Sequence, residues 1–264
     1  MFVDSHCHLD KLKLTKSHGI DHVLNEARAA QVEHMLCIGV TLDDFHEMQS
    51  IVGSHSEVSF SCGVHPLYVA KHGFNEQGLR DLCKREDVVA VGETGLDYYY
   101  DKEHHRIQQD SFACHVDIAT TLKKPLIIHT RDARSDTIDI LRNGHAERCG
   151  GVMHCFTESL EMAEQAMDLG FYISISGIAT FANAKELREV VRHIPLERLL
   201  IETDSPWLAP VPYRGKENQP GYVQHVAQCV AELKDVGVDE VAATTRHNFY
   251  HLFGVQPTPL ASES

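Results

Sequence analysis

A short apolar run that is followed by a histidine or a carboxylate occurs five times along this chain. The runs are Phe2-Val3, Val88–Val91, Leu126–Ile128, Val152-Met153 and Leu199–Ile201. Such a run predicts a buried strand, and the polar residue just after it is then placed at the carboxyl end of that strand. The carboxyl ends of parallel strands meet at one end of a barrel. The polar residues predicted to share one site are therefore His6, His8, Glu93, His129, His154 and Asp204.

Eight candidate strands recur along the chain at nearly regular intervals. They cover about 2–5, 34–40, 57–63, 88–92, 125–129, 151–155, 171–175 and 198–203. The residues expected at their carboxyl ends are His8, Val40, His65, Glu93, His129, His154, Gly177 and Asp204, separated by 23 to 36 residues. A strand, a crossover helix and two short loops need about 30 residues. The spacing therefore predicts an α/β fold, a single (β/α)8 TIM-type barrel.

Helix signals occupy the gaps between these strands. Thr41 and Asp44 resemble a capping box that opens a helix through about His55, and a second helix stops near Gly144. The segment 103–122 is predicted to bury a stripe formed by Ile107, Phe112, Val116 and Ala119. Two final helices, at about 223–233 and 238–252, follow the eighth strand, and we expect the last one to close the barrel.

Length and composition agree with one domain. A chain of 264 residues with 43% hydrophobic residues can form one α/β barrel, which predicts a single domain over 1–257 and a flexible tail at 258–264. We expect a cytoplasmic protein because neither an apolar stretch of about 20 residues nor a signal peptide is recognisable. Eight scattered cysteines without a CxxC motif are typical of reduced core residues.

The net charge of −14 argues against a protein that coats nucleic acid with a basic face. Phosphate contacts of that kind need clustered lysines and arginines. Catalysis on a phosphodiester is still compatible with this charge, because bound divalent metals can supply positive charge where the substrate enters.

His6 and His8 are spaced to act together. Alternate residues of a strand point to the same face, so both rings are predicted to face the barrel mouth, with Asp4 one step deeper. Taken alone, such a pair is as compatible with a structural pair as with a metal site. The four further candidates at matched strand ends favour metal ligands. The remaining histidines, apart from His65, are expected at the surface or on helices.

Two carboxylates complete the candidate set. Glu93 lies between Gly92 and Gly95, and its two oxygens suit a bridge between two cations; the alternative is a capping or loop glutamate. Asp204 is interpreted as a ligand and the proton acceptor. Glu202, on the same face as Asp204, either orients a histidine or forms a salt bridge inside the barrel. Lys124 precedes its strand, so a carbamylated lysine bridge is not expected.

Four histidines and two carboxylates are suitable ligands for two divalent metal ions per chain. Zn, Mn, Fe and Ni fit this donor set, and Mg is tolerated if waters complete its coordination. Two ions about 4 Å apart would lower the pKa of a bridging water and neutralise charge on the attacked group. Phosphoesters, amides and lactones are all substrates for such chemistry.

Further polar residues are candidates for catalysis and substrate binding. His65, in a Gly-Val-His-Pro turn, and Arg131, two residues after His129, are predicted to stabilise the added negative charge and to contact substrate. Arg214, Lys216 and Asn218 follow the eighth strand, where barrels often bind phosphate, and form a candidate anion cradle. The alternatives are salt-bridge or turn residues for the first two and an ordinary solvated loop for the other three.

Taken together, these motifs resemble the TatD family of metal-dependent hydrolases, within the amidohydrolase-type barrels, and most closely its YcfH-like branch. The matching segments are 6–10, 63–66, 92–97, 129–132, 154–156, Gly177 and 202–206. The resemblance extends from about residue 2 to Gly254 and implies a TIM-type barrel with a divalent-metal centre. It places the family's ligands on His6, His8, Glu93, His129, His154 and Asp204. Trp207 stands where relatives often carry tyrosine.

The function that this resemblance implies is that of a deoxyribonuclease, often one that acts as an exonuclease from the 3′ end. We expect a metal-activated hydroxide to cleave phosphodiester bonds at DNA ends or in short oligonucleotides, with no membrane and no obligate protein partner. One alternative is hydrolysis of a small ester, amide or aminoacyl ester at the same metals. Another is a metal-dependent nucleic-acid-binding protein without catalysis.

Overall fold

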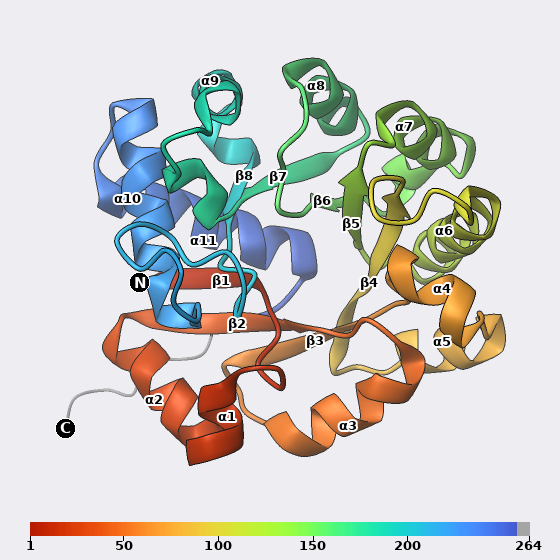
Figure 1. The fold of residues 1–264 in the computed structure, drawn as a ribbon, viewed down its shortest axis with the longest axis horizontal. Coiled ribbons are helices and arrows are strands. Elements are labelled where there is room, and N and C mark those ends of the chain that lie inside the picture. Colours follow the sequence, from red (N-terminus) through yellow and green to blue (C-terminus); the bar gives the residue numbers. More distant parts are fainter. Residues whose placement is uncertain (258–264) are drawn as a thin grey trace.

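Eight parallel strands follow one another in sequence order in the computed structural model, which describes residues 1–257. The tail expected at 258–264 lies outside the described residues. The strands form a ring with the helices outside it (Figure 1). They are β1 (Phe2–Cys7), β2 (Val32–Ile38), β3 (Val58–Cys62), β4 (Val88–Asp97), β5 (Leu126–Arg131), β6 (Gly151–Met153), β7 (Phe171–Ile175) and β8 (Leu199–Ile201). The predicted (β/α)8 barrel is confirmed.

Polar contacts close the ring between its first and last strands. Cys7 forms a parallel bridge with Ser205, and the Ser5 hydroxyl donates to the carbonyl of Ile201 at 3.0 Å. The buried Asp4 carboxylate accepts from both the backbone N–H and the hydroxyl of Thr203. The segment that follows β8 is therefore fastened to β1, next to the residues expected at the mouth.

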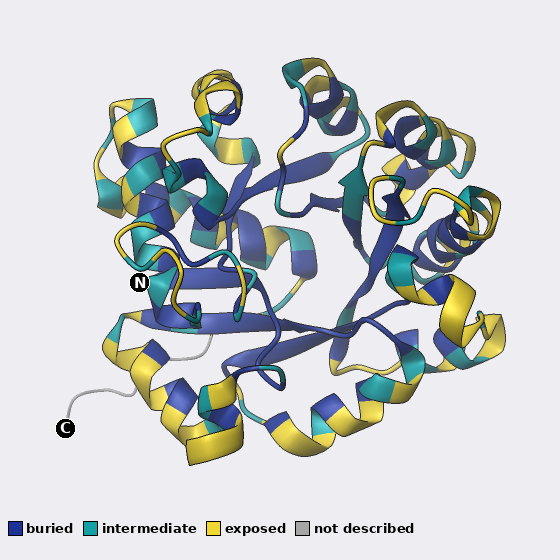
Figure 2. Ribbon diagram, viewed as in Figure 1, coloured by how far each residue is buried: buried dark blue, intermediate teal, exposed yellow. Residues whose placement is uncertain are grey.

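Helices cover the outside of the ring and bury one face each (Figure 2). They are α1 (Lys13–His18), α2 (Ile20–Ala29), α3 (Leu42–Val52), α4 (Pro66–His72), α5 (Glu76–Cys83), α6 (His105–Leu122), α7 (Arg134–Asn143), α8 (Leu160–Asp168), α9 (Lys185–His193), α10 (Val223–Lys234) and α11 (Val238–Phe253). Thr41 caps α3 as predicted, because its side chain accepts from the N–H of Asp44. Ile107 was wrongly placed in the buried stripe of α6 and is 45% exposed. It lies five residues before Phe112, about 140° away around the helix.

β4 is longer than the predicted strand and contains an irregularity. It continues through Glu93 to Asp97, and its register with β5 shifts between Val91 and Thr94. Gly92 and Gly95 have φ values of 145° and 134°, and a Cβ on Gly95 would lie 2.0 Å from the carbonyl oxygen of His129. Glycine is required at such a close approach. The two glycines therefore lie inside a bulged strand and do not end it in a turn.

The amino end of the barrel is filled by α11. Phe249 and Phe253 pack against side chains that point into the ring, including Val3, Ala90 and Ile127. The Asn248 amide donates to the carbonyl of Leu199 at the start of β8. This helix closes the barrel at the end opposite the carboxyl ends of the strands, so only the mouth is left for a site. No helix within residues 1–257 is long and apolar enough to span a membrane.

Candidate metal centre

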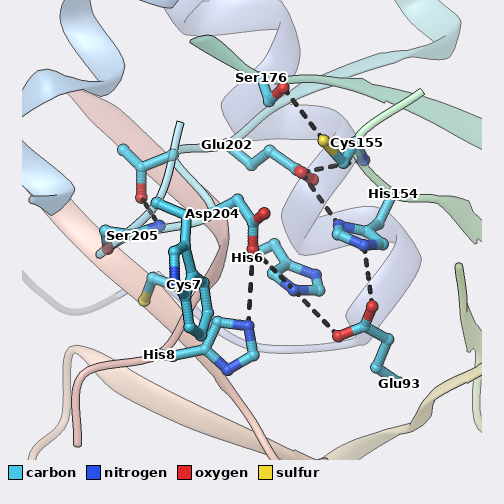
Figure 3. A network of polar contacts seen from close by, with 12 residues as sticks. His6, Cys7, His8, Glu93, His154, Cys155, Ser176, Glu202, Asp204 and Ser205 are labelled. Atoms are coloured by element: carbon cyan, nitrogen blue, oxygen red, sulfur yellow. Dashed lines mark hydrogen bonds and ion pairs between the residues drawn. The ribbon is translucent and has the colours of Figure 1, made fainter. Parts of the chain in front are cut away.

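The six predicted ligands converge at the barrel mouth, and each lies on one of five strands or in the residues just after it. His6 is on β1 and His8 just beyond it, Glu93 is on β4, His129 is on β5, and His154 and Asp204 follow β6 and β8. Figure 3 shows five of these side chains pointing toward one another. All six are largely buried: the most exposed side chains are His129 at 21% and Asp204 at 15%. The structure thus brings the six side chains together at one end of the barrel, as the positions of the apolar runs predicted.

Glu93 lies between two groups of histidines, with one carboxylate oxygen turned to each. Its Oε1 is 3.0 Å from His154 Nε2 and 3.4 Å from Nδ1 of His129. Its Oε2 is 3.5 Å from His6 Nε2. Asp204 adds a second carboxylate to the latter side, because its Oδ1 is 3.6 Å from His6 Nε2 and 3.5 Å from His8 Nε2.

The arrangement fits metal ions. Both ring nitrogens of the buried His6 lack a hydrogen-bond partner, which is costly for a group removed from water. Donor atoms of His6, His8 and Glu93 all lie within 4.8 Å of one another, and so do those of His65, Glu93 and His129. The two groups share Glu93, and a third group of His6, His154 and Glu202 links them, with the rings of His6 and His154 stacked 3.8 Å apart. Imidazole and carboxylate donors at this spacing are those that divalent transition metals bind.

His65 approaches this cluster more closely than a substrate-binding residue would need to. Its Nε2 is 3.4 Å from Oε1 of Glu93, and its Nδ1 accepts from the N–H of Leu67 at the start of α4. The ring is therefore fixed by the first turn of that helix. The sequence predicted a donor to substrate, whereas the structure places His65 among the possible ligands.

Two further carboxylates contact the ring nitrogens of His154 and His129 that do not face Glu93. Glu202 Oε1 is 3.1 Å from Nδ1 of His154 and also accepts from the N–H of Cys155. Asp97 Oδ2 is 2.9 Å from Nε2 of His129. A carboxylate on the second ring nitrogen fixes the tautomer and orientation of a ligating histidine. Asp97 is not among the residues predicted for the site, although its position four residues after Glu93 on an extended strand was the available signal.

Burial and neighbouring charges oppose each other at Glu93, His154 and Asp204. Burial would raise the pKa of Glu93, but His154 and His65 outweigh it and hold that pKa well below its usual value. Burial would lower the pKa of His154, but Glu93 and Glu202 raise it well above normal. For Asp204, burial is outweighed by His8 and His6, so its pKa is lowered. Both carboxylates are therefore ionised at neutral pH, as ligands must be.

Three of the candidate substrate-binding residues are cations that lie over aromatic rings. The Arg131 guanidinium lies over the ring of Tyr99, 3.9 Å from its centroid. Arg214 lies 4.3 Å from the ring centroid of Phe181, and Lys216 lies over Tyr213. None of these three cations has a carboxylate partner among the described ion pairs.

Asn218 does not belong to the anion cradle. It is fully buried, and its amide nitrogen donates to the carbonyls of Thr203 and Trp207. Its side-chain oxygen accepts from the N–H of Gln219. Both ends of the amide are therefore used in holding the loop that follows β8 against the barrel, so the earlier assignment is corrected. Trp207, in the same loop, is 52% exposed, with its ring against His8.

A parallel eight-stranded barrel whose mouth gathers histidines and carboxylates in this way defines a metal-dependent hydrolase. The family model for TatD related DNase matches residues 3–254. The protein described as uncharacterized metal-dependent hydrolase YcfH, from Escherichia coli strain K12, is 52% identical over 261 residues, 98% of each chain. The 3'-5' ssDNA/RNA exonuclease TatD of Citrobacter koseri is 33% identical, covering 89% of this chain and 93% of its own.

A solved structure agrees with these sequence matches. YjjV, a TatD homolog from Escherichia coli K12, superimposes with a TM-score of 0.90 at 29% identity and covers 97% of this chain and 98% of its own. The chain belongs to the TatD-related DNase family. The resemblance drawn from the sequence motifs is thereby confirmed.

Proposed function

We propose that this protein is a nuclease that uses two divalent metal ions to remove nucleotides from the 3′ ends of DNA. The observation that carries the proposal is Glu93, whose Oε1 faces His129 and His154 while its Oε2 faces His6. A shared carboxylate with nitrogen donors on both sides is suited to a pair of ions. A nuclease is further supported by the C. koseri relative, which is described as a 3'-5' ssDNA/RNA exonuclease.

Six residues would hold the ions, with Glu93 between them. His6, His8 and Asp204 would bind on one side, and His129 and His154 on the other. When bound, such ions supply a nucleophilic water at neutral pH and neutralise charge on the phosphate.

Asp204 is the carboxylate best placed to take up a proton. Its side chain is 15% exposed, against 4% for Glu93, so it is the one that incoming water reaches more readily. Its lowered pKa keeps it ionised and able to accept the proton. Asp97 and Glu202 keep His129 and His154 in fixed orientations. Preorganised groups of this kind need little rearrangement during the reaction.

Phosphate contacts are assigned to His65, Arg131, Arg214 and Lys216. The three cations are supported by aromatic rings and are not neutralised by carboxylates, so their N–H groups can bind an anion. His65 faces the same carboxylate oxygen as His129 and His154 and could donate to an oxygen of the scissile phosphate.

The test uses metal-stripped protein with single-stranded DNA labelled at its 5′ end, to which Mg, Mn or Zn is added back. We expect a ladder that shortens from the 3′ end only with metal, and a loss of about 100-fold or more in kcat for Glu93→Gln and Asp204→Asn. Glu147→Gln, on an exposed side chain in the loop before β6, is the matched control.

Two results would contradict the proposal. Intact DNA under every metal, together with hydrolysis of a small ester or amide, would assign the site to the alternative hydrolase. Tight metal-dependent binding of DNA without product would indicate a binding protein. Release of the labelled terminal nucleotide without a ladder would show cleavage from the 5′ end and would correct the polarity alone.

A further inference from the structure

A cluster of two exposed tyrosines and one arginine lies at the mouth beside His129, and the metal centre does not use it. Tyr99 and Tyr100 lie two and three residues after Asp97, the last residue of β4, and are 48% and 65% exposed. Their rings are perpendicular to each other, with centroids 4.9 Å apart. The Arg131 guanidinium lies 3.9 Å from the centroid of Tyr99 and 4.7 Å from that of Tyr100. We call these three residues the tyrosine platform.

The platform is rigidly connected to the candidate metal site. Asp97 Oδ1 accepts from the backbone N–H groups of Tyr99 and Tyr100, at 3.1 and 2.8 Å. The other oxygen of the same carboxylate contacts His129. Arg131 is two residues beyond His129 on β5, about 7 Å further along the strand. One carboxylate therefore fixes both a candidate ligand and the turn that presents the rings.

Nothing within residues 1–257 accounts for these side chains as structural elements. Large aromatic side chains are usually buried, whereas these two are 48% and 65% exposed. The hydrogen bonds and ion pairs of the described chain include none from the Arg131 guanidinium, although the chain carries 38 acidic residues. An arginine held by rings keeps its N–H groups free for a ligand.

We propose that the tyrosine platform binds a nucleotide next to the scissile phosphate: an unpaired base stacks on Tyr99 or Tyr100, and Arg131 binds a phosphate of the same strand. This inference rests on the proposed nuclease function and adds to it a site on this chain for an unpaired base. Every base has a face that can stack on an aromatic ring, so the platform accepts all four bases. In a duplex that face is covered by the neighbouring base pair.

Stacking also suits a protein of this charge. A net charge of −14 repels a polyanion as a whole, and stacking on an uncharged ring does not depend on that charge. The platform would hold the strand by its bases while the metal centre holds the scissile phosphate. Binding at both places would therefore favour a nucleotide strand over a simple phosphodiester that carries no base.

The experiment measures kcat and KM on single-stranded hexathymidylate in which one abasic residue is moved along the chain. In the wild-type protein, one position is expected to raise KM about five-fold or more, which corresponds to the weaker end of base–aromatic stacking, with kcat little changed. The double variant Tyr99→Ala/Tyr100→Ala should raise KM on the intact oligonucleotide by a similar factor. In that variant, the abasic residue at the same position should add no further effect.

Two conservative variants separate stacking from other effects. Tyr99→Phe/Tyr100→Phe keeps both rings and should keep both the KM and the sensitivity to the abasic residue. Arg131→Gln should raise KM on the oligonucleotide. Arg192→Gln removes the same charge from the last turn of α9, at the other end of the barrel, and should not.

The inference and the proposed function fail in distinguishable ways. If the wild-type protein degrades the oligonucleotides but the alanine double variant keeps the same position-dependent rise in KM, the platform is not a base site and the nuclease assignment stands. If the wild-type protein degrades no oligonucleotide with Mg, Mn or Zn, the proposed function is overturned, and this inference is overturned with it.

Discussion

His115 is expected to make the metal-free protein lose stability as the pH falls. Its ring is fully buried, Nε2 accepts from the N–H of Val64 at 3.0 Å, and Nδ1 donates to the carbonyl of Ser111. Only the neutral ring can accept that bond. Burial lowers the pKa of His115 from 6.5 to about 4. Since Val64 immediately precedes His65, this ring also supports the turn that carries a candidate ligand.

Proton linkage gives the sign and the size of this change in the free energy of unfolding. Between the unfolded and folded pKa values, the unfolded chain binds a proton that the native protein does not, so stability falls as the pH falls through that range. A shift of about 2.5 units corresponds to about 3.4 kcal/mol in full. About 2.4 kcal/mol of this is lost between pH 7 and pH 4.5.

The assay is urea unfolding of metal-free protein at these two pH values, in the wild type and in His115→Gln. Glutamine does not titrate, and its amide oxygen can still accept from Val64. We expect the free energy of unfolding of the variant to fall about 2.4 kcal/mol less between the two pH values than that of the wild type. His34, whose pKa is also lowered to about 4 by burial, is present in both proteins and cancels in the comparison. Equal losses in the two proteins would refute the reasoning.

Three further predictions concern the metal centre and the core. Asp97→Asn should lower the metal affinity about 10- to 100-fold, because the amide no longer fixes His129. The affinity is measured in competition with a chromophoric chelator. The control Asp101→Asn removes a similar contact to an exposed histidine and should leave the affinity unchanged. Phe249→Ala should reduce the free energy of unfolding by about 3–5 kcal/mol in urea titrations, whereas Ile107→Ala on the exposed side of α6 should change it by no more than about 0.5 kcal/mol. Removal of metal should lower the melting temperature, since a metal at 100 times its Kd contributes about 2.7 kcal/mol; an unchanged melting temperature after chelation and metal addition would contradict the assigned centre.

The barrel could be predicted because each strand carries its own signal. Apolar runs of a few residues, repeated at the length of a strand–helix unit, leave few arrangements other than a ring of parallel strands. The ligand positions follow from the same pattern, since the residue after a run is placed at the mouth whatever the details of packing. Glu93 is the exception, because it does not stand after the end of its strand. It lies within β4, where two glycines allow a bulge that the apolar pattern did not indicate.

Side-chain directions in loops and in the interior could not be read from the sequence. Asn218 has the residue type of a phosphate ligand, and only the folded loop shows that two carbonyls occupy its amide. His34 was expected at the surface or on a helix but is buried in β2 against Ser59. A histidine in an apolar strand has the same sequence signature whether it faces the mouth or the outer helices.

The charge of the mouth explains why this chain should need metal to act on DNA at all. Glu93, Asp204, Asp97 and Glu202 place four carboxyl groups within one cluster, and the histidines whose pKa is raised, His8, His129 and His154, can balance at most three of these charges. A phosphodiester entering such a cluster without cations would meet negative charge in a region of low dielectric, where repulsion is strong. Two divalent ions would reverse the sign of the field at the point of attack. Metal-free protein should therefore fail to bind the scissile phosphate as well as fail to cleave it.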